Sequence, residues 1–211
     1  MDYLKIFAPA TVANVSCGFD SLGFAVDSLG DEMTFTKTKE KGVKITVITG
    51  ADLTFDIDKN AASAVVKKIL NEANANFGIS LTIHKGFSPG SGLGSSAASA
   101  AGAAFGANQL LGNPFTELEL TKFAMFGEEV ACGTPIADNV SAAIFGGFVL
   151  VRSYKPLEII KLPVPSALRV VAIHPQIEVK TKDAREVLPK EIPLKDAVIQ
   201  WANVGDRKSV V

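Results

Sequence analysis

The chain has 211 residues, of which 47% are hydrophobic and 20% are charged, enough for the core of one large domain or two small ones. A formal net charge of -1 at pH 7 gives no global field for nucleic acid or anionic lipid, so we expect a small-molecule partner. Cys17 and Cys132 lie far apart without C-x-x-C spacing, and no N-terminal leader pattern is visible. The longest small-apolar run, 97–112, is too short to span a bilayer, and together these features predict a cytoplasmic chain with reduced thiols.

The first part of the chain alternates between strand and helix patterns. β-branched and aromatic residues with partial two-residue alternation predict three strands, over residues 4–10, 32–40 and 43–50. Apolar residues then recur at helical spacing over 59–78, with Asp58 as the expected N-cap and Gly78 as the stop. A further strand is predicted over 79–85.

The second part opens on a glycine-rich stretch, SPGSGLGSSAASAAG at 88–102, which leads into an alanine-rich helix. Thr116 and Glu119 form a capping box that predicts the next helix, over 116–131. Strand patterns return over residues 143–153, 157–162 and 168–175. A proline-rich bend near 156–165 indicates a domain boundary, which divides the chain into residues 1–155 and 156–211.

The glycine-rich stretch fits a site for phosphate. A strand, a glycine loop and a helix in this order leave the N–H groups of the first helical turn pointing into the loop, where glycines allow close approach and serines add donors. Composition alone also allows a second interpretation, a packing seam of small residues. No lysine follows Gly94 as in the Walker A motif, and the pattern is not that of a Rossmann unit, so a P-loop NTPase is disfavoured.

The order of residues in the loop points to a family. PGSGLGSSAASA resembles the phosphate loop of the GHMP kinases, the superfamily that includes galactokinase, homoserine kinase and mevalonate kinase. Residues 6–27 resemble the substrate-binding first motif of the homoserine kinases and residues 128–148 their central segment, and the similarity continues through 173–189 and 197–205. The resemblance implies a two-layer α+β GHMP kinase fold, with an N-terminal domain similar to the second domain of ribosomal protein S5. It also implies a partial ferredoxin-like C-terminal domain, with ATP between the two.

The resemblance implies a site for ATP and Mg²⁺. The residues that would wrap the phosphates are Pro89, Gly90, Ser91, Gly92, Leu93, Gly94, Ser95 and Ser96. Asn60 and Lys85 match nucleotide-contacting positions, although Lys85 alone also fits a surface charge at a strand end. Ser96 and Glu128 match the metal ligands, and their hard oxygen atoms suit Mg²⁺. Without the resemblance, Glu128 would fit a solvated residue at a helix end.

The resemblance also implies a pocket for L-homoserine, formed by Asn14, Asp20, Asp138, Thr181 and Arg185. Asp20 suits the ammonium group, and Arg185, four residues after Thr181, can bind a carboxylate through two hydrogen bonds. Asn139 stands where mevalonate kinase and galactokinase have an aspartate, and an amide cannot act as a general base. Asn139 and Glu128 are therefore the catalytic candidates in a direct in-line transfer of the γ-phosphoryl group.

The expected function is the ATP-dependent phosphorylation of L-homoserine to O-phospho-L-homoserine in threonine biosynthesis, with no nucleic acid or membrane as partner and a homodimer left open. Ile136 stands where the family commonly has histidine, and Ser141-Ala142 replaces the common Ala-Pro. The family's chain continues beyond residue 205 with a third glycine-rich motif and a second substrate arginine, which implies a C-terminally truncated member. Two alternatives stay open: a nucleotide-binding protein without catalysis, and a GHMP kinase for another small alcohol.

Overall fold

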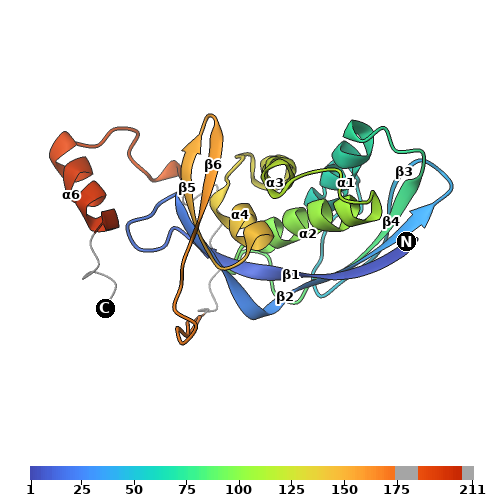
Figure 1. Cartoon of the computed structure of the whole chain (residues 1–211), viewed down its shortest axis with the longest axis horizontal. Helices are drawn as coiled ribbons and strands as arrows, with labels where there is room; N and C mark the ends of the chain where they lie inside the picture. The colour runs from blue at the N-terminus through green and yellow to red at the C-terminus, as the bar shows by residue number, and fades with distance from the viewer. Residues whose placement is uncertain (174–184, 206–211) are drawn as a thin grey trace.

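The computed structural model describes residues 1–173 and 185–205 of the chain (Figure 1). Within them, six strands form one sheet in the order β3-β4-β2-β5-β6, with β1 paired to β2 beside this path. The strands are β1 (Tyr3–Ala13), β2 (Leu22–Thr38), β3 (Gly42–Thr49), β4 (Gly78–His84), β5 (Phe148–Tyr154) and β6 (Leu157–Leu162). β2 holds the sheet together because, of its 17 residues, those at 32–38 pair with β4 and those at 22–24 pair with β5.

The helices α1 to α4 gather on one face of this sheet, and α6 lies at the opposite end of the molecule from the N-terminus (Figure 1). Their bounds are α1 (Ala61–Glu72), α2 (Ser95–Leu110), α3 (Glu117–Cys132), α4 (Asp138–Phe145) and α6 (Leu194–Gly205). β3 and β4 are parallel and are joined through α1, whereas the other paired strands run antiparallel. The result is a two-layer α+β arrangement.

The core lies between the sheet and the helices, with α2 at its centre. α2 is built largely of alanine and glycine, so its backbone comes close to the large side chains of the sheet. A Cβ atom added at Gly106 would lie 2.4 Å from the ring of Phe35, and one added at Gly102 would lie 2.8 Å from the sulfur of Met33. Phe35 and Met33 are both fully buried. The small residues of α2 therefore set the distance between this helix, including its N-terminus, and the sheet.

Most elements agree with the sequence patterns, and the capping box of Thr116 and Glu119 is confirmed. The predicted strand over 143–153 is wrong for residues 143–145, which form the end of α4. The predicted cap of α1 is wrong: Asn60 caps it, because its Oδ1 accepts the N–H groups of Ala62 and Ser63 at 3.0 and 3.4 Å. The predicted strand over 168–175 is wrong for residues 168–173, which adopt no regular structure and pair with no described strand.

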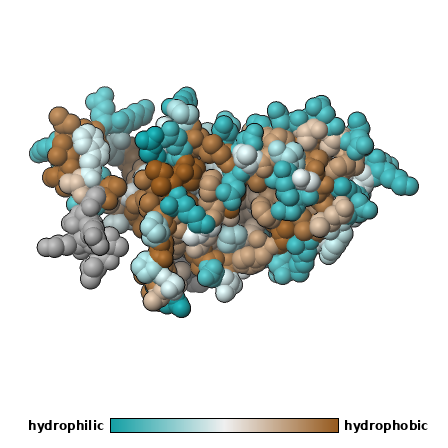
Figure 2. All heavy atoms as spheres, viewed as in Figure 1, coloured by the Kyte–Doolittle hydropathy of each residue, from teal (hydrophilic) through white to brown (hydrophobic). Residues whose placement is uncertain are grey.

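The segment after β5 extends the sheet and then leaves it. β6 pairs with β5 beyond the predicted boundary at 155, which stays a prediction. α6 exposes Leu194, Val198, Ile199 and Trp201, and brown apolar atoms mark this helix at the left of the molecule (Figure 2). No helix among residues 1–173 and 185–205 is long and apolar enough to span a membrane.

Candidate active site

The glycine loop between β4 and α2 has the conformation that its composition indicates. Gly90, Gly92 and Gly94 have φ angles of 75°, 74° and 68°, a region that favours glycine. Gly94 is the N-cap of α2, and none of the side chains that the structure describes caps the first turn of this helix. The N–H groups of that turn, together with the positive end of the helix dipole, can therefore bind an anion.

Asn139 lies against this loop. Its Oδ1 accepts a hydrogen bond of 2.7 Å from the Thr11 hydroxyl, and the N–H of Thr11 donates to the Leu93 carbonyl at 2.9 Å. A Cβ atom added at Gly94 would lie 2.1 Å from Thr11 Oγ1 and 2.9 Å from Asn139 Oδ1. β1, α4 and the loop thus meet at one point, and Asn139 is beside the proposed phosphate site.

Glu128, on α3, lies near Ser96 in the first turn of α2. Its side chain is buried, and its Oε1 has no hydrogen-bond partner among the described residues. Burial raises the pKa of Glu128 to about 7, against the opposing effects of a hydrogen bond with Ser96 and the charge of Lys85. A buried carboxyl oxygen without a partner, beside a serine hydroxyl, is an arrangement that a cation would complete.

Asp138 begins α4 and is also buried. Its Oδ1 accepts the backbone N–H of Asn139 at 2.7 Å, while its Oδ2 finds no partner in the part of the chain that is described. Burial raises the pKa of Asp138 to about 6; the Asn139 hydrogen bond and the Arg185 charge oppose this, and the Asp20 charge adds to it. Asp138 Oδ2 is therefore a second buried oxygen that can accept a hydrogen bond from a ligand.

The predicted homoserine residues of the first motif lie beside α4. Asn14 Oδ1 accepts the backbone N–H of Asp20 at 2.9 Å, and both residues have positive φ angles, of 55° and 53°. Arg185 forms an ion pair with Asp20 and lies over the ring of Phe19 at 5.2 Å. Two residues predicted to bind opposite ends of an amino acid therefore neutralise each other in this structure. Thr181 lies outside the described residues.

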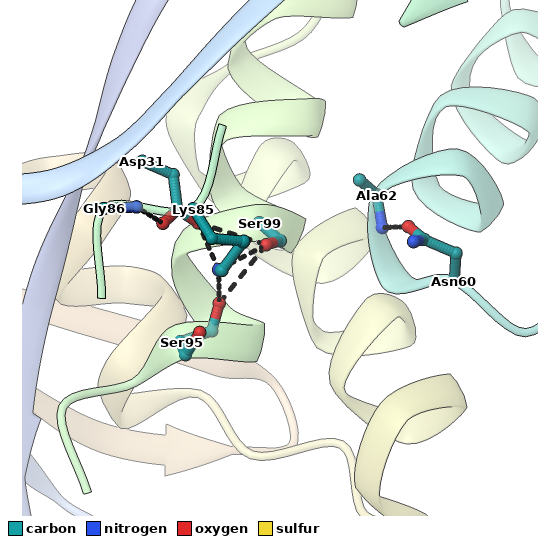
Figure 3. Close-up of polar contacts among 7 residues, drawn as sticks. All are labelled: Asp31, Asn60, Ala62, Lys85, Gly86, Ser95 and Ser99. Carbon is teal, nitrogen blue, oxygen red and sulfur yellow. Dashed lines mark hydrogen bonds and ion pairs between the residues drawn. The ribbon is translucent and has the colours of Figure 1, made fainter. Parts of the chain in front are cut away.

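Asn60 and Lys85 have internal partners. Asn60 caps α1 and donates from Nδ2 to the Thr54 carbonyl at 3.0 Å. Lys85 is buried behind the loop, where its Nζ contacts Asp31, the Ser95 carbonyl and the Ser99 hydroxyl (Figure 3). Burial lowers the pKa of Lys85, and the Asp31 charge opposes this shift. Their predicted contacts with nucleotide stay predictions.

Sequence reasoning missed Tyr154. Its hydroxyl donates to the Asp20 carbonyl at 2.9 Å and accepts the backbone N–H of Ala137 at 3.3 Å, so it ties the first motif to the start of α4. Burial raises the pKa of Tyr154 to about 12. Only its place directly after the predicted strand 143–153 could have drawn attention to it.

Two further features bear on ligands. An open pocket of about 540 Å³ lies between α3 and the β5–β6 turn; it carries Lys68, Lys122 and Lys155 but includes no residue of the glycine loop. Among the described residues, no group of three or more His, Cys, Asp or Glu side chains is arranged to hold a metal ion. A metal ion at the loop would therefore need Ser96, Glu128 and oxygen atoms of its ligand.

The fold and the loop together define a kinase of the GHMP type. Residues 60–147 match the family model described as the GHMP kinases N terminal domain. The chain is 48% identical to a homoserine kinase of Chlorobium phaeovibrioides over 97% of its own length and 68% of that protein. It resembles the crystal structure of homoserine kinase from Cytophaga hutchinsonii with a TM-score of 0.89 and 51% identity, over 97% of this chain and 66% of that one.

A mevalonate kinase from Methanococcus jannaschii, 16% identical with a TM-score of 0.59 over 77% of this chain, shares the fold. The chain belongs to the homoserine kinase family. It spans about two thirds of the length of these relatives. The family and the α+β GHMP fold expected from the motifs are confirmed.

Proposed function

We propose that the site binds ATP with Mg²⁺ and directs phosphoryl transfer from ATP to the hydroxyl of L-homoserine, giving O-phospho-L-homoserine for threonine biosynthesis. The observation that carries this proposal is the meeting of three elements at one point: the uncapped N-terminus of α2, the buried carboxyl of Glu128, and Asn139 at the start of α4. An anion, a cation and a small polar acceptor each find suitable groups there.

The loop from Pro89 to Ser96 would hold the phosphates. Its backbone N–H groups and the Ser95 and Ser96 hydroxyls can donate to phosphate oxygens, and Ser95 Oγ is buried without a partner in the described chain. Because the donors belong to a helix terminus and a constrained loop, they are oriented before the ligand arrives. Such preorganised donors stabilise the charge that develops on a transferring phosphoryl group.

Ser96 and Glu128 would hold Mg²⁺. The buried Oε1 of Glu128, which has no hydrogen-bond partner among the described residues, and the nearby Ser96 hydroxyl fit a hard cation that keeps water and phosphate oxygens as its other ligands. Bound Mg²⁺ neutralises charge on the phosphates. Charge on Glu128 is then favoured, because the cation opposes the effect of burial on its pKa.

The acceptor would lie between Asp20, Asp138 and Arg185. An amino-acid zwitterion carries one positive and one negative group, so it can replace the internal Arg185–Asp20 ion pair without leaving either charge unpaired. Asp138 Oδ2 offers a further acceptor. Ile136 is buried and supplies no polar contact where the family has histidine.

Asn139 would position the hydroxyl without removing its proton. Its Oδ1 already accepts from Thr11, and an amide has no useful basicity at neutral pH. The transfer would be in line and would depend on positioning and charge stabilisation, with the proton passing to phosphate or solvent.

We place this reaction in the cytoplasm, in keeping with Cys17 and Cys132 as free thiols. A homodimer remains a prediction that sedimentation can test.

The proposal is tested by measuring ADP release from MgATP with homoserine, mevalonate, shikimate or galactose as acceptor. We expect homoserine alone to accelerate release, and Arg185→Ala to abolish that acceleration. Acceleration by another alcohol would favour a different GHMP kinase. Tight MgADP binding without any acceptor-dependent release would favour a nucleotide-binding protein.

A further inference from the structure

A buried ion pair lies directly behind the glycine loop. Asp31 comes from β2 and Lys85 follows β4, and their side chains are 0% and 1% exposed. The two residues are 54 positions apart in the sequence, and the close-up shows them between the loop entry and the first turn of α2 (Figure 3). Nothing in the proposed reaction so far uses Asp31.

The pair binds both ends of the loop. At the entry, Asp31 Oδ1 accepts the backbone N–H of Gly86 at 3.2 Å. At the exit, Lys85 Nζ donates to the Ser95 carbonyl at 2.8 Å and to Ser99 Oγ at 2.9 Å. Ser99 Oγ also lies 3.2 Å from Asp31 Oδ2, which closes the network.

The ammonium group of Lys85 has three N–H donors, and this network gives each of them an acceptor: Asp31, Ser95 and Ser99. Its positive charge is balanced by Asp31 at direct contact. In this conformation Lys85 has neither a free donor nor an uncompensated charge to offer to a phosphate.

A buried ion pair of this kind is a poor source of net stability, because removing two charges from water offsets most of their attraction. What it does supply is geometry. Gly86 and Ser95 are tied to the same two side chains, so the loop between them has fixed ends. A Cβ atom added at Gly86 would lie 1.9 Å from the Gly30 carbonyl, which shows how closely the loop entry approaches β2.

We propose that Asp31 and Lys85 are positioning residues, which hold the loop entry and the first turn of α2 so that their N–H groups are already oriented for the phosphates. The inference rests on the proposed function, because it concerns the same site. It differs from direct binding of phosphate by Lys85, which the resemblance to the family would suggest.

The two roles of Lys85 predict opposite changes in nucleotide affinity for Asp31→Asn. If Lys85 were a phosphate ligand, loss of the Asp31 charge would release its ammonium group, and nucleotide affinity would stay the same or rise. If the pair positions the loop, the same substitution loosens both ends and affinity falls. In metal sites, loss of a hydrogen-bond partner behind a ligand typically costs 10–100-fold in metal affinity, and for the analogous loss behind the phosphate loop we expect MgADP to bind about tenfold more weakly.

The experiment is a calorimetric titration of MgADP into the wild-type chain and Asp31→Asn, at a temperature where both are folded by circular dichroism. Glu32→Gln is the charge control, because the neighbouring Glu32 pairs with the exposed Lys5 at 2.9 Å. Ile69→Ala is the stability control, because Ile69 is fully buried in the second half of α1, whereas the loop leads into α2. Both controls should bind MgADP as the wild type does, and the Ile69 variant should do so despite a lower Tm.

Ser99→Ala provides a second variant in case Asp31→Asn does not fold. It removes the hydroxyl that bridges Asp31, Lys85 and Ser95 but leaves both charges in place, and we expect it to weaken MgADP binding several-fold. Unchanged or tighter binding by either folded variant would overturn the inference. So would an equal loss of affinity in the Ile69 control, since the effect would then be one of stability alone. A wild-type chain that binds no MgADP would overturn the proposed function, and the inference with it.

Discussion

Substitution of Glu128 by glutamine separates two effects of this carboxyl: the loss of folding stability that its burial causes, and its proposed binding of Mg²⁺. Burial raises its pKa from 4.5 to about 7. Between pH 4.5 and pH 7 the Glu128 carboxyl holds a proton in the folded chain that it has lost in the unfolded chain. The folded state is therefore most stable below about pH 4.5, where the carboxyl is neutral in both states, and this stability is lost as the pH rises through 7. At 1.36 kcal/mol per unit, the shift corresponds to about 3 kcal/mol of lost stability above pH 7.

Glu128→Gln does not titrate, so its stability relative to the wild type should increase by about 2 to 3 kcal/mol between pH 5 and pH 8. For a chain of this size the Tm difference should grow by roughly 5–10 °C over that range. The measurement is chemical and thermal unfolding at both pH values in EDTA, with Glu129→Gln as control because Glu129 is adjacent and exposed. MgADP affinity should fall in the same variant that gains stability. An equal stability difference at pH 5 and pH 8 would refute this reasoning.

Three further substitutions test the loop, the chemistry and the acceptor pocket. Gly94→Val should abolish MgADP binding, because its side chain would meet Thr11; Gly112→Val has a similar φ angle but open space, and it should bind normally. Asn139→Ala should lower kcat while the pH–rate profile keeps its shape. Loss of an ionisation from that profile would contradict the proposal that Asn139 positions the hydroxyl without acting as a base. Tyr154→Phe removes two hydrogen bonds and should raise the KM for homoserine about fivefold or more while the KM for ATP stays constant. Tyr3→Phe is its control, and equal effects on both KM values would count against the assignment.

The sequence predicts those structural features that depend only on residues close together in the chain. The capping box at Thr116 needs only residues within one turn, and the glycines of the loop need only their own backbone angles. The cap of α1 was misplaced because Asp58 and Asn60 are both good caps. The choice of Asn60 depends on its further bond to the Thr54 carbonyl, which no local pattern records.

Contacts between distant segments were the part that sequence could not supply. The Asp31–Lys85 pair and the Tyr154 bridge to Asp20 each join segments that only the sheet pairing brings together. α4 was missed because its eight residues, between glycine-rich turns, carry too few helical repeats for a periodic signal. The family resemblance made Asp138 and Asn139 site candidates, which they stay as predictions, but it did not reveal that they begin a helix.

A structure of the chain with MgADP and homoserine bound would test the central claim most directly. We predict the β-phosphate within hydrogen-bond distance of the N–H groups of Gly92 to Ser96, the metal between Ser96 and Glu128, and homoserine in place of the Arg185–Asp20 ion pair. Phosphates bound instead among the lysines of the pocket between α3 and the β5–β6 turn, with the loop empty, would contradict the account.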